Sequence, residues 1–151
     1  MLKRILSLTV IFSSLFVTSA FAEVSEETAY ILNSFLFLVS GFLVMLMALG
    51  FCLLESGMVT SKSVSAIAAK NIGLYSISGI MFWLVGYNLA YGIPEGGYIG
   101  SFTTWTDGSA LADGYSASSD WFFQMVFCAA TASIVSGTLA ERIKIWPFFL
   151  F

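Results

Sequence analysis

The segment Trp121–Ala140 constrains the fold more than any other part of the chain, because it carries no charged side chain. Asp120 stands at one end, and Glu141, Arg142 and Lys144 stand at the other. An α-helix rises about 1.5 Å per residue, so as a helix the segment measures about 30 Å, the thickness of a bilayer's hydrocarbon core. Because lipid offers no partner to free backbone amides, we predict a transmembrane helix here.

Composition places the rest of the chain in the same class. Hydrophobic residues make up 58% of it and charged residues 10%, whereas soluble domains carry about 25% charged residues. No basic patch points to a nucleic-acid partner. The sequence has no histidine, and Cys52 and Cys128 lie in apolar segments. We interpret them as packing thiols rather than a disulfide or metal pair, and expect neither a metal nor a cofactor.

The other apolar runs extend this pattern. Two of them, 29–54 and 66–92, are long enough to cross a bilayer. With 121–140 they predict an all-α integral membrane protein with three complete transmembrane helices. A fourth run begins at 146–151 and stops, so we expect the chain to be the first part of a longer protein.

The first 22 residues are predicted to be a signal peptide. Lys3 and Arg4 precede an apolar stretch, and Ala20-Phe21-Ala22 matches an A-x-A cleavage site. An uncleaved anchor is the alternative. Cleavage would leave residues 23–151 as the membrane domain, with its N-terminus outside the cytoplasm.

Charge asymmetry predicts the orientation in the cytoplasmic membrane. Lys62, Lys70, Arg142 and Lys144 all fall on one side of the three spans. The loop 93–119 has no Lys or Arg. The positive-inside rule therefore places the link 55–65 and residues 141–145 in the cytoplasm, and the loop outside. We interpret the loop as a solvated connector, with a ligand-binding loop as the alternative.

Two faces of the third span differ in character. Ala129, Ser133 and Gly137 form a row of small residues, with a second row of Ala132, Ser136 and Ala140 beside it. These rows predict a close helix crossing at Gly137, with Val126 away from it. A second face carries aromatic and hydroxyl side chains: Phe123, Phe127, Thr131, Ile134 and Thr138. This second face would line a narrow path or pack against lipid or a helix, and spacing alone favours packing.

Several motifs carry a family resemblance. Phe123 to Phe127, Thr131 and the run Ile-Val-Ser-Gly-Thr-Leu-Ala-Glu-Arg at 134–142 resemble the third membrane helix of the Amt/Mep/Rh ammonium transporters, on the Amt side. The run Gly-Phe-Cys-Leu-Leu-Glu-Ser-Gly-Met-Val at 50–59, with Lys62, Lys70 and Asn71, resembles the family's first and second helices. The matches follow the family's order from about Tyr30 onward.

The resemblance implies a fold and a site. The family has eleven membrane helices in two inverted halves, and it forms homotrimers with one pore in each subunit. By this resemblance Phe127 is the phenylalanine gate of an ammonium/ammonia pore, with Phe123 and Gln124 beside it. The family's paired pore histidines, a key acid and an aromatic cap belong to later helices. A nitrogen-regulatory signal protein on the cytoplasmic face is a further partner that the resemblance raises.

Other functions remain open from the sequence. An ammonium sensor would use the same fold, and a purely structural membrane subunit is a further class. A membrane enzyme would need convergent ionisable groups within the spans, and 29–54, 71–94 and 121–140 have none. Glu55 and Glu141 are expected to stabilise a helix start or to pair with a nearby Lys or Arg.

Overall fold

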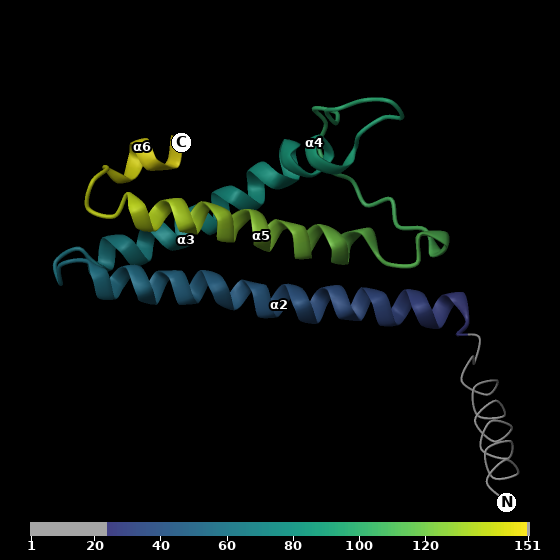
Figure 1. Ribbon diagram of the computed structural model, residues 1–151, viewed down its shortest axis with the longest axis horizontal. Coiled ribbons are helices and arrows are strands. Elements are labelled where there is room, and N and C mark those ends of the chain that lie inside the picture. Colours follow the sequence, from purple (N-terminus) through teal and green to yellow (C-terminus); the bar gives the residue numbers. More distant parts are fainter. Residues whose placement is uncertain (1–23, 151) are drawn as a thin grey trace, which may run out of the picture.

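The computed structural model describes residues 24–150, and every regular element among them is helical (Figure 1). The predicted signal peptide lies outside the described residues. The elements in chain order are α2 (Glu26–Met58), α3 (Val64–Met81), η1 (Phe82–Gly86), α4 (Tyr87–Tyr91), η2 (Leu111–Asp113), α5 (Ala117–Thr138) and α6 (Ile145–Leu150). Three helical stretches are long and apolar enough to cross a membrane: Glu26–Met58, Val64–Tyr91 and Ala117–Thr138. The predicted all-α membrane class is confirmed.

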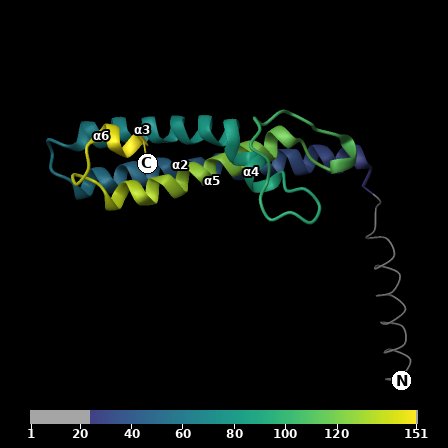
Figure 2. The same cartoon turned by 90° about the horizontal axis from the view of Figure 1, so that it is seen from above.

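The three long helices pack as one bundle. α2 and α5 lie side by side and run in the same direction, while α3 crosses them in the opposite direction (Figures 1 and 2). Both short links, 59–63 and 139–144, lie at one end of the bundle. The long segment 92–116 lies at the other end, near the start of α2. The two short connections therefore lie at one end of the bundle, and the long connection lies at the other end.

The first helix is longer at its C-terminal end than the sequence predicted. Ser25 caps its start by accepting a hydrogen bond from the backbone N–H of Thr28. The helix then continues through Gly57 to Met58. The prediction that 55–65 forms a link is therefore wrong at its beginning. Glu55 belongs to the last turns of α2, where a cation from α3 compensates its charge.

The second long helix contains one turn of π-helix, which the sequence did not predict. In this turn the N–H of Tyr87 donates to the carbonyl of Phe82. The neighbouring carbonyl of Trp83 accepts a 2.9 Å hydrogen bond from the N–H of Trp105 in the long loop. The Asn88 amide donates to Thr103 as well. The loop is largely exposed, as expected of a connector, but these bonds fix it to the end of the second helix.

The core lies mainly along α5. Phe82, Met125 and Val126 form its apolar centre, and Val126 is only 1% exposed. Gly137, at the end of the predicted small-residue row, is exposed, although a Cβ there would lie 3.7 Å from Glu55 of α2. The contact line follows Ala129, Ser133 and Ser136, all buried. On a helix of 3.6 residues per turn, position 136 lies about 20° from position 129, whereas position 137 lies about 80° from it.

A buried polar network joins the three long helices through one oxygen atom. Glu55 is 2% exposed and Lys70 5% exposed. Glu55 Oε2 lies 3.2 Å from Lys70 Nζ, and it accepts hydrogen bonds from Asn71 Nδ2 and Ser136 Oγ, each of 3.1 Å. Lys70 Nζ also donates to the Ser136 carbonyl at 3.0 Å. We call Glu55, Lys70, Asn71 and Ser136 the Glu55 network.

The network predicts how the bundle responds to losing a charge. Lys70→Met in the complete protein should destabilise it by about 3–5 kcal/mol, because Glu55 would then be a buried, uncompensated carboxylate. The double variant Glu55→Gln/Lys70→Met should recover most of that loss. Thermal unfolding of the purified protein in detergent measures both. A Lys70→Met protein as stable as the parent would show that the pair does not hold the helices.

A second contact fixes α2 on α5. A Cβ at Gly41 would lie 2.6 Å from Phe122 Cε1, so the Phe122 ring occupies the space that any larger residue needs. Phe122 also packs against Phe42, with ring centroids 5.4 Å apart. Within Glu26–Met58 the only buried residues are Gly41 and Glu55. These are the two residues of α2 that the bundle buries.

We predict that Gly41→Ala will destabilise the complete protein by about 1–3 kcal/mol through overpacking. Gly50→Ala is the matched control, because a Cβ at Gly50 meets nothing within 4 Å. Adding Phe122→Leu to Gly41→Ala should restore stability, since it removes the clashing ring atoms. Equal melting temperatures for the two glycine variants would contradict the close contact.

Candidate functional site

A row of aromatic rings runs along the contact between α2 and α5. Phe37 of α2 contacts Tyr115, with ring centroids 5.2 Å apart, and Phe123 of α5, at 5.5 Å. Phe123 in turn meets Phe127 edge-on at 5.0 Å. We call Tyr115, Phe37, Phe123 and Phe127 the aromatic row. The structure thus brings Phe123 and Phe127 into contact and adds two rings that the sequence did not single out.

Phe127 ends this row on a face that none of the described helices covers. It is 42% exposed, and Ile134 is 55% exposed. Thr131 and Thr138 are exposed on the same side of α5. We call Phe127, Thr131, Ile134 and Thr138 the open face of α5. It runs from the aromatic row to the end of the helix, on the side predicted to line a path or to pack.

The hydroxyl groups of this open face are occupied by their own helix. Thr131 Oγ1 donates to the carbonyl of Phe127 at 3.0 Å, and Thr138 Oγ1 donates to the carbonyl of Val135 at 2.8 Å. Their protons are therefore not available to a ligand. The face offers rings, methyl groups and a few oxygen lone pairs, which suits a small molecule with little or no charge.

Gln124 lies on a different face and binds Asp120. Its Nε2 donates to Asp120 Oδ1 at 3.3 Å. Asp120 is buried, and its Oδ2 accepts a 2.6 Å hydrogen bond from the Tyr87 hydroxyl. Because a carboxylate can only accept, this contact assigns the Gln124 amide nitrogen as the donor. The three predicted site residues thus separate into a contacting Phe pair and a Gln held by an acid.

Sequence reasoning treated Asp120 only as the end of a span. In the structure it sits among stacked rings: Trp105 and Trp121 lie 5.4 Å apart at 30°, and Tyr87 contacts Trp105. The one available signal was the spacing of four residues between Asp120 and Gln124, which places both on one side of a helix. Nothing in the sequence pointed to a contact of Asp120 with Tyr87 or to the loop residue Trp105.

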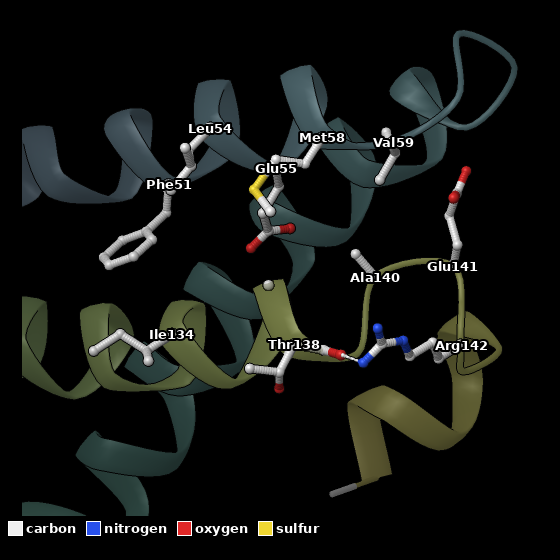
Figure 3. Close-up of a pocket in the computed structure, with 11 residues that line it drawn as sticks. Phe51, Leu54, Glu55, Met58, Val59, Ile134, Thr138, Ala140, Glu141 and Arg142 are labelled. Carbon is white, nitrogen blue, oxygen red and sulfur yellow. Dashed lines mark hydrogen bonds between the residues drawn. The ribbon is translucent and has the colours of Figure 1, made fainter.

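A groove opens at the other end of α5, between the C-terminal parts of α2 and α5 (Figure 3). Its volume is about 650 Å³. The lining is mostly apolar and comprises Phe51, Leu54, Glu55, Met58, Val59, Ile134, Gly137, Thr138, Ala140, Glu141 and Arg142. Ile134 and Thr138 belong both to this groove and to the open face. The two features are therefore continuous along α5.

The residues after α5 close one side of the groove. Glu141 Oε1 accepts hydrogen bonds from the N–H of Thr60 at 3.0 Å and from its hydroxyl at 2.7 Å. The Thr60 hydroxyl bond is the main reason that the pKa of Glu141 lies below its usual range. Arg142 donates to the Thr138 carbonyl at 3.2 Å. The predicted pairing with a basic residue is thus confirmed for Glu55, whereas Glu141 binds Thr60.

No group of three or more His, Cys, Asp or Glu side chains comes together within residues 24–150. Cys52 and Cys128 are free thiols. The described part of the chain therefore assembles no donor set for a metal ion, and its polar side chains bind one another.

Comparison with known proteins identifies the family that this chain matches. The model of the Ammonium Transporter Family matches residues 34–151. The ammonium transporter Amt2 of Archaeoglobus fulgidus is 38% identical over 117 residues, covering 76% of this chain and 24% of that protein. The ammonium transporter Amt2 of Methanocaldococcus jannaschii is 34% identical over 119 residues, covering 77% of this chain and 28% of that protein. The ammonium transporter of Aquifex aeolicus is 30% identical over 139 residues, covering 88% and 33%.

No solved structure matches the chain. The chain spans about a quarter to a third of the length of these curated relatives. The family model nevertheless covers most of its residues, including all three apolar helices except the first turns of α2. The chain belongs to the ammonium transporter family.

Proposed function

We propose that this chain forms the first part of an ammonium transporter in which the open face of α5 lines the path. The observation that carries the proposal is the position of Phe127. It ends a contacting aromatic row, and it begins a face that none of the described helices covers. In the complete protein, later helices would close this face into a narrow pore.

The chemistry of the face fits such a path. A cation is costly to move into a low-dielectric channel, and neutral ammonia costs much less. Aromatic ring faces attract a cation at the mouth, with a contribution of about 0.5–2 kcal/mol. The threonine protons are bound to the helix, so the face beyond Phe127 is mainly apolar. We infer that ammonium is held at Phe123 and Phe127 and that a neutral form passes along Thr131, Ile134 and Thr138.

Gln124 has a supporting role in this proposal. Its amide nitrogen is engaged by Asp120 on a different face of α5 from the Phe123–Phe127 pair. Gln124 would therefore support the ring pair by anchoring this end of α5 to Asp120.

The same proposal includes the orientation and the assembly. Residues 1–22 act as a signal peptide, and the mature N-terminus and the loop 93–119 lie outside the cytoplasmic membrane. The links at 59–63 and 139–144 lie in the cytoplasm. The complete protein is a homotrimer, and its cytoplasmic face is where a nitrogen-regulatory signal protein would bind.

An ammonium sensor is the second candidate. It would use the same aromatic row to bind ammonium but would not move it across the membrane. Net uptake by the complete protein separates these two functions.

Labelling of single cysteines tests the orientation. Ser109 lies in the long loop and Ser61 in the short link, and both are exposed. An impermeant thiol reagent applied to intact cells should label the complete protein carrying Ser109→Cys and not Ser61→Cys, in a background without Cys52 and Cys128. The opposite labelling pattern would reverse the orientation.

Substitution of Phe127 tests the path. In the complete protein Phe127→Ala should raise the half-saturation concentration for methylammonium uptake about 2- to 30-fold, because the ring's attraction for the cation is lost. Stability should change little, since no described helix packs on this face. The exposed Phe35 of α2 provides the matched control Phe35→Ala. Phe122 is unsuitable as a control because its ring packs on Gly41. If Phe127→Ala transports like Phe35→Ala, in rate and in selectivity against potassium, Phe127 is a packing residue.

A further inference from the structure

The two carboxylate oxygens of Glu55 differ in their hydrogen-bond partners. Oε2 binds Lys70 and accepts from Asn71 and Ser136. Oε1 has no hydrogen-bond partner among residues 24–150, although the side chain is almost fully buried. A buried acceptor without a donor costs free energy, so a buried carboxylate oxygen in this position is expected to serve some donor.

The unpaired oxygen lies beside the groove at the end of the open face. Glu55 lines that groove together with Ile134, Gly137 and Thr138. Figure 3 shows its carboxylate between α2 and α5. A Cβ at Gly137 would lie 3.7 Å from Oε1. Oε1 is itself buried, and Gly137, which has no side chain, lies beside it at the edge of the groove.

Lys70 determines what such an oxygen can bind. Its ammonium group neutralises the carboxylate from the Oε2 side and is itself fixed by the Ser136 carbonyl and by the Phe148 ring, 5.2 Å away. Oε1 is thus a hydrogen-bond acceptor within a neutral pair rather than an isolated anion. It would bind a small N–H donor weakly enough for the donor to leave. A carboxylate without the Lys would bind the same donor more tightly.

We propose that Glu55 Oε1 is a second binding site for the N–H groups of ammonium or ammonia, at the Glu55 end of the path. This inference rests on the proposed function. The open face of α5 leads from Phe127 through Thr131 to Ile134 and Thr138, and the last two residues lie in the same groove as Glu55. The transported molecule meets this acceptor at the opposite end from the aromatic row.

Gly137→Ala tests the site without changing any group of the Glu55 network. The added methyl group makes ordinary contact with Glu55 Oε1 at 3.7 Å, so it blocks the Gly137 side of the oxygen without strain. Gly57→Ala is the matched control, at nearly the same depth, because a Cβ there meets nothing within 4 Å. Both variants would be made in the complete protein and compared in right-side-out and inside-out membrane vesicles with methylammonium as the probe.

Gly137→Ala should raise the half-saturation concentration about tenfold for transport that starts from the Glu141 side, which is the loss of one hydrogen bond to a charged group. From the aromatic-row side the half-saturation concentration should stay within about twofold of the parent, since binding there does not involve Glu55. Gly57→Ala should match the parent on both sides. Unchanged values on both sides, or an equal rise on both sides, would overturn the proposal.

Glu55→Gln provides a second variant that does not depend on Gly137. The amide keeps the shape of the carboxylate, and its oxygen can still accept from Lys70, Asn71 and Ser136, which turns its N–H₂ donor toward the groove. The same one-sided rise is expected, and one-sided values equal to the parent would contradict the site. If the unaltered protein transports no methylammonium, the proposed function fails; if it transports and the one-sided effect is missing, only this second site fails.

Discussion

A pair of opposite charges inside a membrane helix bundle is the interaction on which the arrangement of α2, α3 and α5 depends. Glu55 and Lys70 are both buried, and an unpaired charge in such surroundings is strongly unfavourable. Compensation requires α2 and α3 to meet at one depth, while Ser136 adds α5 through its hydroxyl and its carbonyl. The network, the Gly41–Phe122 contact and the Phe37–Phe123 ring contact together set how this helix lies on α5.

That placement divides α5 into faces with separate tasks. Val126, Ala129, Ser133 and Ser136 are buried against the other helices. Phe127 and Ile134 on the other side are exposed, and the groove beside Glu55 continues that side. A helix that is fixed along one face can present the opposite face to a path without losing its position. The Asp120–Tyr87 hydrogen bond anchors the other end of α5 in the same way.

The sequence predicted the long helices and the two-sided character of α5, because uncharged length and the helical period are local properties. The sequence-based prediction was wrong where contacts between residues far apart in the chain determine the structure. Glu55 was assigned to a link, but α2 continues through it to Met58, and its carboxylate pairs with Lys70 of α3. The small residues of α5 predicted its packing side, but the buried line runs through Ser136 of the second small row and leaves Gly137 exposed. Tyr87, Trp105 and the π turn at Phe82–Gly86 interact with Asp120 or the loop through contacts that no spacing in the sequence reveals.

An experimental structure of the complete protein, determined with methylammonium present, tests the central claim most directly. A continuous narrow cavity should run along Phe127, Thr131, Ile134 and Thr138, with the cation against the Phe123 and Phe127 rings. A structure in which later helices pack tightly over these four side chains, leaving no cavity, would contradict the assignment of this face to the ammonium path.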